Sequence, residues 1–549
     1  MFVGFGALPL VLPVISWLNA ALLPGDCVAQ TQPANKLMRS SALVGSMTFI
    51  SRILGLARDV VMARYLGADG AADAFYVAFR IPNMFRRFFA EGAFSQAFVP
   101  VLSEYRAGGN IQAVRYLIDR VAGCLGLSLL LLCSLVVVAA PYLMVVFAPG
   151  FSEGTERYGL AVDLIRIMFP YLLFISLAGF VGSILNSYDK FAIPAFTPVF
   201  LNIILIAAAV GFSGGATHPA IALGWGVLIA GVVQLGFQLP FVAQLGLTPK
   251  PKLDFKDPAV TKVLRLMAPA LFGASVSQLN ILINTMIASL LPVGSVSWMS
   301  YSDRLVELPL GIFAVAIATV ILPVMSRQMK AQPEAATATL DWGMRSVLII
   351  AIPACLALVV LAKPILIALF CYGAYDERDA LMSSYSLMTY AAGLPAFMLV
   401  KVLVSGFASR MDTKTPVKIG LWVLAANMAL NAVVVWPLHH FWQVGHAGLT
   451  LATALAAMVN ALWLYIGLHR KHGFKTTPGW GRFIGQLIIS AVAMVAVLIA
   501  LLNFSPEFIE LVFWQRLAWL ALMCGAGLAV YFLALFVCGI RLKDFKGHF

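Results

Sequence analysis

Charged residues inside apolar segments are the side chains of this sequence that could do chemistry. They fall in three groups, which are Arg52, Arg58 and Asp59, then Asp73, Arg80, Arg87 and Glu91, then Asp303, Arg304 and Glu307. In the second group, spacings of seven, seven and four residues predict one stripe along a helix. A charge in the middle of a bilayer costs about 3 kcal/mol and is rarely kept without a partner, a water-filled cavity or a ligand. We therefore expect a polar cavity inside the membrane.

The expected cavity is rich in arginine. Arg86 and Arg87, with Asn83 before them, form the densest cluster. Guanidinium groups bind phosphate through two parallel hydrogen bonds and keep their charge, so the predicted ligand is an anion. The residues predicted to bind or move this ligand are Arg52, Arg58, Asp73, Arg86, Arg87, Glu91, Arg304 and Glu307. The residues predicted to complete the lining are Asp59, Asn280, Asn284 and Asp303.

Other polar residues in apolar segments have simpler explanations. Arg166 and Lys401 each stand alone, so we expect their side chains to reach the membrane interface, which is also an alternative for Arg80. Asn427 and Asn431 lie one helical turn apart and are a weak candidate for an ion site, because hydrogen bonding between helices is commoner. The seven cysteines show no metal-binding spacing, and no cofactor is predicted.

The composition predicts an all-α polytopic membrane protein. Of the 549 residues 61% are hydrophobic and 11% are charged, against about 25% charged residues in a soluble domain. Apolar runs long enough to cross a hydrocarbon core of about 30 Å recur along the chain. Fourteen membrane-spanning helices are predicted near residues 42–65, 73–101, 120–147, 160–186, 192–213, 219–245, 263–291, 296–325, 343–369, 382–408, 416–437, 447–468, 482–503 and 516–539.

The basic residues predict the orientation of these helices. The even-numbered loops and the C-terminal tail hold 22 Lys and Arg residues, whereas the odd-numbered loops hold 5 and collect acidic residues. Positively charged loops stay in the cytoplasm, so both termini are predicted to be cytoplasmic. The net charge of +13 is spread between the apolar runs and forms no single patch, so nucleic acid is not an expected partner.

The chain contains an internal repeat. SILNSYDKFAIP aligns with SGFASRMDTKTP at an offset of 222 residues, and VPVLS aligns with LPVMS at an offset of 223. Six helices separate the copies, so the halves are predicted to be parallel repeats around an axis along the membrane normal. The predicted domains are an N-lobe of helices one to six at 38–246, a cytoplasmic linker at 247–262, a C-lobe of helices seven to twelve at 263–475, and helices thirteen and fourteen with a basic cytoplasmic tail at 476–549.

The first residues differ from the rest of the chain. Residues 1–24 are apolar and uncharged, and the first basic residues are Lys36 and Arg39. A secretory signal begins with a basic stretch, which this segment lacks. Met38 opens a sequence typical of a chain start, so we expect residues 1–37 to be a lead-in upstream of the true start.

Four segments resemble the MurJ/MviN family, the lipid II flippases of bacterial cell-wall synthesis within the multidrug/oligosaccharidyl-lipid/polysaccharide exporter superfamily. They are SRILGLARD, ADAFYVAFRIPNMFRRFFAEGAFSQAFVPVLSEY at 72–105, GSVSWMSYSDRLVELPLG at 294–311, and KTPVKI. The resemblance runs from about Met38 to the C-terminus. It implies two six-helix lobes with a terminal helix pair, in the bacterial inner membrane, around a cationic cavity that opens alternately to each side. The implied cargo is undecaprenyl-diphosphate-linked disaccharide pentapeptide, moved from the cytoplasmic to the periplasmic leaflet.

The resemblance also assigns roles to residues. The family's transport residues fall on Arg52, Arg58, Asp73, Arg86 or Arg87, Arg304 and Glu307. Some members use an ion site with carboxylate ligands, where this chain offers Asn280, Asn284, Asn427, Asn431 and Thr453. Sodium coupling is therefore in doubt, and a coupling ion or the membrane potential is left open as the driving force.

The resemblance implies a transporter and not an enzyme. The expected partners are lipid II and membrane lipids, with cell-wall synthases as candidates. Three alternatives remain open. A flippase for another polyprenyl-diphosphate-linked oligosaccharide shares the fold. A drug or cation antiporter of the same fold would need buried carboxylates more than arginines. A glycosyltransferase would need a catalytic loop outside the membrane, and the loops here are short.

Overall fold

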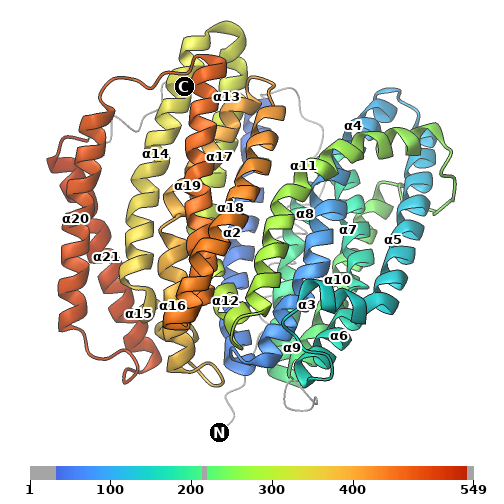
Figure 1. Cartoon of the computed structure of the whole chain (residues 1–549). Helices are drawn as coiled ribbons and strands as arrows, with labels where there is room; N and C mark the ends of the chain where they lie inside the picture. Colours follow the sequence, from blue (N-terminus) through green and yellow to red (C-terminus); the bar gives the residue numbers. More distant parts are fainter. Residues whose placement is uncertain (1–32, 213–218, 541–549) are drawn as a thin grey trace. The chain divides into compact units, whose positions relative to one another are not determined.

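The computed structural model describes residues 33–212 and 219–540, and this part of the chain is entirely helical (Figure 1). The contacts divide the chain into two units, residues 1–46 and Met47–Phe549, and the second unit holds every predicted site residue. The predicted lead-in at 1–37 lies almost wholly outside the described residues, so its status stays a prediction.

The described residues form fourteen helical segments, some of them interrupted. Their bounds are α2 (Pro33–Leu66); α3 (Gly70–Arg86) with α4 (Ala93–Ala107); α5 (Ile111–Phe147); α6 (Glu156–Met168) with α7 (Tyr171–Ser187); α8 (Ala192–Phe196) with α9 (Pro198–Phe212); α10 (Pro219–Gln244); α11 (Pro258–Ser289); α12 (Ser295–Pro309) with α13 (Val315–Ala331); α14 (Pro333–Val360) with α15 (Ala362–Phe370); α16 (Glu377–Ala391) with α17 (Leu394–Ala408); α18 (Lys414–Trp442); α19 (Gly445–His472); α20 (Trp480–Phe504); and α21 (Phe513–Val537).

These segments confirm the prediction of an all-helical polytopic membrane protein, and each overlaps one predicted span. In the described part, ten are long and apolar enough to cross a membrane, and α16 with α17, bent by 40°, makes an eleventh. The three that fall short are α2, α3 with α4, and α11. These three carry many of the charged and amide residues that the sequence singles out.

The backbone repeats at the spacing of the sequence repeat. A π-helical segment at Arg87–Glu91 joins α3 to α4, and another at Leu310–Ala314 joins α12 to α13. The two begin 223 residues apart, which is the offset of the VPVLS and LPVMS motifs. A π-turn adds a residue to one helical turn and often marks a functional site. The match supports the two repeats, while the lobe boundaries and the linker remain predictions.

The start of α12 is fixed by α3. The carboxylate of Asp73 accepts hydrogen bonds from the backbone N–H of Gly294 (2.8 Å), the backbone N–H of Ser297 (2.9 Å) and the Ser297 hydroxyl (2.7 Å). Asp73 is 1% exposed. A carboxylate suits a helix N-terminus because unpaired backbone N–H groups point outward there. One turn further along α12, the Tyr301 hydroxyl donates to the Gly67 carbonyl at 2.7 Å. Both contacts lie on the predicted periplasmic side.

The terminal helix pair is anchored near its predicted cytoplasmic end. Helices α20 and α21 contact each other and also α14 and α15 (Figure 1). The buried carboxylate of Asp341 on α14 accepts hydrogen bonds from Arg345 Nε (3.0 Å), the Thr477 backbone N–H (3.2 Å) and Trp480 Nε1 (2.7 Å). The Arg345 guanidinium also lies over the Trp480 ring, 5.2 Å from its centroid. These contacts join α14 to the first residue of α20.

A second anchor lies at the other end of the pair. The guanidinium of Arg516 on α21 is buried and donates to the carbonyls of Ile367 and Cys371, at 3.3 Å each. Those carbonyls belong to the last turn and the C-cap residue of α15, where a cation is favourable. The pair is therefore held to α14 near one end and to α15 near the other.

Replacing Asp341 with alanine is expected to destabilise the protein by about 3 kcal/mol, because several donors and the partly buried Arg345 lose their acceptor. The matched control is Asp163→Ala, which removes an exposed ion pair with Arg166 (3.5 Å) worth about 0–1 kcal/mol. Thermal unfolding of the two purified variants in detergent measures the difference. Equal apparent Tm values for the two variants would show that the Asp341 contacts do not hold α20.

Candidate functional site

The first cavity lies among α2, α3, α7, α9, α10 and α12, and has a volume of about 540 Å³. Its charged lining residues are Arg52, Arg58, Arg86, Arg304 and Glu307. Its other polar lining residues include Thr48, Ser51, Ser95, Ser183, Asn186, Thr197, Asn202, Gln234 and Gln238. Four arginines against one acidic residue make the surface of this cavity cationic.

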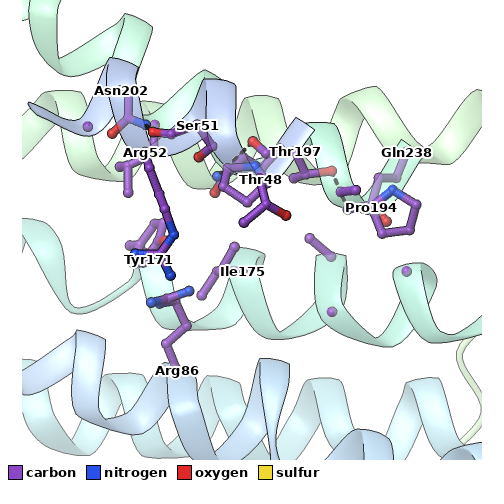
Figure 2. Close-up of a pocket in the computed structure, with 18 of the residues that line it drawn as sticks. Thr48, Ser51, Arg52, Arg86, Tyr171, Ile175, Pro194, Thr197, Asn202 and Gln238 are labelled. Atoms are coloured by element: carbon purple, nitrogen blue, oxygen red, sulfur yellow. Dashed lines mark hydrogen bonds between the residues drawn. The ribbon is translucent and has the colours of Figure 1, made fainter. Parts of the chain in front are cut away.

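Two arginines from different helices face each other across the first cavity. Figure 2 shows Arg52 of α2 and Arg86 of α3 pointing toward one another beside Tyr171 of α7. The Arg86 Nε donates to Asn83 Oδ1 at 3.0 Å, which holds the side chain in place. Arg52 lies against Gly311, where any Cβ atom would overlap the guanidinium. In the part of the chain that the structure describes, Arg52 Nε is buried without a hydrogen-bond acceptor. This arrangement suits an anion with oxygens on two sides.

The other two arginines are tied to one buried carboxylate. Arg58 contacts its neighbour Asp59 through Nε (2.9 Å) and Nη2 (2.6 Å), and Arg304 Nε of α12 lies 2.6 Å from the second oxygen of Asp59. The chain of contacts continues from Arg304 Nη1 to Glu307 (3.0 Å), and from Arg58 Nη1 to Asn202 of α9 (3.1 Å). Asp59 is 4% exposed, so its two cations offset the cost of its burial. We call these five residues the Asp59 network.

A second cavity of about 490 Å³ lies on the other side of α12. Its charged lining residues are Arg80, Arg87, Asp303, Glu307 and Lys401. Helices α3, α11, α12, α16, α17 and α19 supply most of its wall, including Gln278, Asn280, Asn284, Tyr390, Thr450 and Thr453. Glu307 lines both cavities, so this part of α12 forms a shared wall.

The structure separates residues that the sequence grouped in one cavity. Arg52, Arg58, Arg86 and Arg304 line the first cavity, whereas Arg87, Asn280, Asn284 and Asp303 line the second. Neighbouring positions on a helix point about 100° apart. Arg86 and Arg87 therefore serve different cavities, although they are adjacent in sequence. The single polar cavity expected from the sequence is corrected to two cavities, whose linings also include residues of other helices.

Of the predicted site residues whose side chains the structure describes, two line neither cavity. Asp59 is buried behind the first cavity in the Asp59 network. Asp73 binds the start of α12, so the structure gives it a positioning contact and places it away from the predicted ligand. The side chain of Glu91 lies outside the described residues.

The second cavity holds Lys401, which was expected at the membrane interface, and Arg80, for which the interface was an alternative. The expectation that Lys401 reaches the membrane interface is wrong, because it lines this cavity. Arg80 donates to the hydroxyls of Thr285 (2.6 Å) and Ser300 (3.1 Å), so it ties α3 to α11 and α12. Arg166 lines neither cavity, is exposed and pairs with Asp163. The residues next to a lone cation in an apolar helix do not indicate which way its side chain points. These placements therefore follow only from the packing of the helices.

The asparagines of the weak ion-site candidate bond to one another. Asn431 Nδ2 donates to Asn284 Oδ1 (2.9 Å) and to Asn427 Oδ1 (3.2 Å), and Asn284 Nδ2 donates to Thr453 Oγ1 (3.1 Å). These bonds join α11, α18 and α19. They are the hydrogen bonding between helices that the sequence offered as the alternative to an ion site. Among the described residues, no group of three or more His, Cys, Asp or Glu side chains could hold a metal ion. An ion site here stays a prediction.

A polytopic helical fold with interrupted spans and an arginine-lined internal cavity defines a membrane transporter. A family model described as "Lipid II flippase MurJ" matches residues 62–518. The chain belongs to the MurJ lipid II flippase family. It is 44% identical over 521 residues to "Probable lipid II flippase MurJ" of Vibrio cholerae, covering 93% of this chain and 98% of the relative. It is 39% identical over 516 residues to "Lipid II flippase MurJ" of Burkholderia cenocepacia, covering 93% and 99%.

Solved structures agree with this assignment. A structure of "Lipid II flippase MurJ, inward closed conformation" superposes with a TM-score of 0.77 at 28% identity, covering 90% of this chain and 98% of that chain. An inward-facing multidrug resistance MATE family transporter superposes with a TM-score of 0.64 at 14% identity, covering 80% and 99%. The second likeness shows a shared fold alone. The chain is therefore a transporter by family and not an enzyme.

The two carboxylates beside Arg304 are expected to differ in role. Asp59→Ala leaves the buried Arg58 without its carboxylate and takes one of two carboxylates from Arg304, at a cost of about 3–5 kcal/mol, and should lower the amount of protein in the membrane. Glu307→Gln leaves Arg304 paired with Asp59, so the protein level should stay normal while transport falls. Immunoblots of membranes and complementation of a depleted host measure both. A matching loss of protein in the two variants would contradict this division.

Proposed function

We propose that this protein flips lipid II from the cytoplasmic to the periplasmic leaflet of the bacterial inner membrane, with the diphosphate bound in the first cavity. The observation that carries the proposal is the facing pair Arg52 and Arg86 (Figure 2). Each guanidinium can make two parallel hydrogen bonds to a phosphate, and the pair approaches from two helices. Family membership supports lipid II as the cargo, because the relatives carry that name.

The physical task explains the cavity. A diphosphate with a sugar and peptide head group cannot enter about 30 Å of hydrocarbon unaided, since its polar groups would lose their water without replacement. The arginines and the amide and hydroxyl side chains of the first cavity replace that water. The polyprenyl tail is apolar and stays in the lipid. No covalent bond is made or broken, so the step is translocation.

The state of the protein fits one stage of alternating access. Asp73 to Ser297 and Tyr301 to Gly67 are direct contacts between the first and second repeats. A backbone hydrogen bond from Ala374 N–H to the Arg64 carbonyl (2.9 Å) adds a third. All three lie on the side of the odd-numbered loops, which the basic residues predict to be periplasmic. We infer a state closed to the periplasm, from which one repeat rocks against the other.

The direct test is depletion of the protein in its native host, followed by an assay of lipid II on each leaflet. Lipid II should accumulate on the cytoplasmic leaflet. Normal translocation of lipid II during depletion would reject the proposal. Accumulation of a different polyprenyl-linked oligosaccharide would assign the first cavity to that cargo instead, since the diphosphate chemistry is shared.

Arg52→Ala and Arg86→Ala should each abolish complementation at normal protein levels. Loss of one charge-assisted contact costs about 1.5–3 kcal/mol, or about 10- to 100-fold in transport. Lysine at either position should restore only part of the transport activity, because its ammonium group lacks the planar guanidinium geometry that makes two parallel hydrogen bonds. Arg166→Ala is the control, since this exposed arginine lines neither cavity, and it should complement fully. Full function of both alanine variants would refute a diphosphate site between these arginines.

A further inference from the structure

The second cavity has no role in holding the diphosphate, yet it carries its own charges. Arg87 and Lys401 both line it, from the end of α3 and from α17. Within the described residues neither side chain has a hydrogen bond or an ion pair. A cation kept at membrane depth without a protein partner implies water or a ligand. Arg80 differs, because its bonds to Thr285 and Ser300 fix it in the wall.

The second cavity also offers a carboxylate and amides. The side chain of Asp303 lines it and interacts there with Tyr390 and Arg80. Glu307 stands at its boundary with the first cavity. Asn280 lines the same cavity, and its Oδ1 is buried without a donor in the described part of the chain. Cations, a carboxylate and amide groups in one cavity match the groups of a peptide with free carboxylates and an amine.

The two cavities adjoin at Glu307, which lines both. Each volume, about 540 and 490 Å³, is typical of a site for one drug-sized molecule. A diphosphate with a disaccharide and five amino acids is larger than such a molecule. One cavity alone is therefore too small for the whole head group, which leaves the second cavity available for part of it.

We propose that the second cavity is a subsite for the peptide of the cargo, with Arg87 and Lys401 receiving its carboxylates and Asp303 receiving its amine. The proposal rests on the proposed function, in which the first cavity holds the diphosphate. It divides recognition into two parts. The first cavity binds the group common to all polyprenyl-diphosphate lipids, and the second selects those that carry an anionic peptide.

Two probes separate the subsites. Purified full-length protein in detergent is titrated with lipid II, and separately with undecaprenyl diphosphate, which has neither sugar nor peptide. Lys401→Ala and Arg87→Ala should each weaken lipid II binding by about tenfold, because each removes one charge-assisted contact. Neither substitution should change the binding of undecaprenyl diphosphate. Arg52→Ala should weaken binding of both lipids. Arg166→Ala should change neither.

A chemical change in the cargo gives a second arm. Lipid II whose peptide carboxylates are amidated should bind the natural protein more weakly, while Lys401→Ala should bind the amidated and natural forms about equally. Equal loss of both lipids in the Lys401 and Arg87 variants, or no loss of either, would overturn the peptide subsite. If Arg52→Ala also leaves both affinities unchanged, the proposed function itself fails.

Discussion

The carboxylate of Asp59 is the group on which the cationic site depends. Arg58 reaches one of its oxygens and Arg304 the other, so a single buried anion compensates the buried Arg58 of α2 and the partly exposed Arg304 of α12. Asn202 and Glu307 satisfy further donors of the same two guanidiniums. Because an uncompensated charge in the interior would cost several kcal/mol, these contacts determine how the first helix of one repeat meets the second helix of the other.

This arrangement divides the arginines by role. Arg58 and Arg304 are paired with Asp59, and they are therefore part of the wall. Arg52 and Arg86 project into the space that the wall encloses, where a ligand can meet them (Figure 2). Helix α12 is held at its start by Asp73 and in its middle by Asp59. A movement that releases the first contact must therefore displace a wall of both cavities, which links opening of the predicted periplasmic side to the state of the site.

Local patterns predicted the helices well, and the arginine-rich cavity in outline. The apolar runs located fourteen segments, and the i, i+3 spacing of Arg304 and Glu307 predicted their ion pair, which is present at 3.0 Å. The partner of Arg304 from another helix was not predictable, because Asp59 lies 245 residues away and no periodicity connects the two. Asp303 and the asparagines Asn280 and Asn284 of α11 line the second cavity. The expected direction of the Lys401 side chain was wrong for the same reason, because helix packing decides which way a lone cation points.

Charge balance among the described residues supports the proposed diphosphate ligand. The first cavity has four arginines, and Glu307 together with the adjoining Asp59 supplies two carboxylates, which leaves a surplus of two positive charges among these residues. Each phosphate of a diphosphate linked at both ends carries about one negative charge. The bound complex is then close to neutral in a region where a net charge is costly. A cationic drug would raise the surplus, and a neutral glycolipid would leave it unchanged. An anion of charge near two is the ligand that removes it.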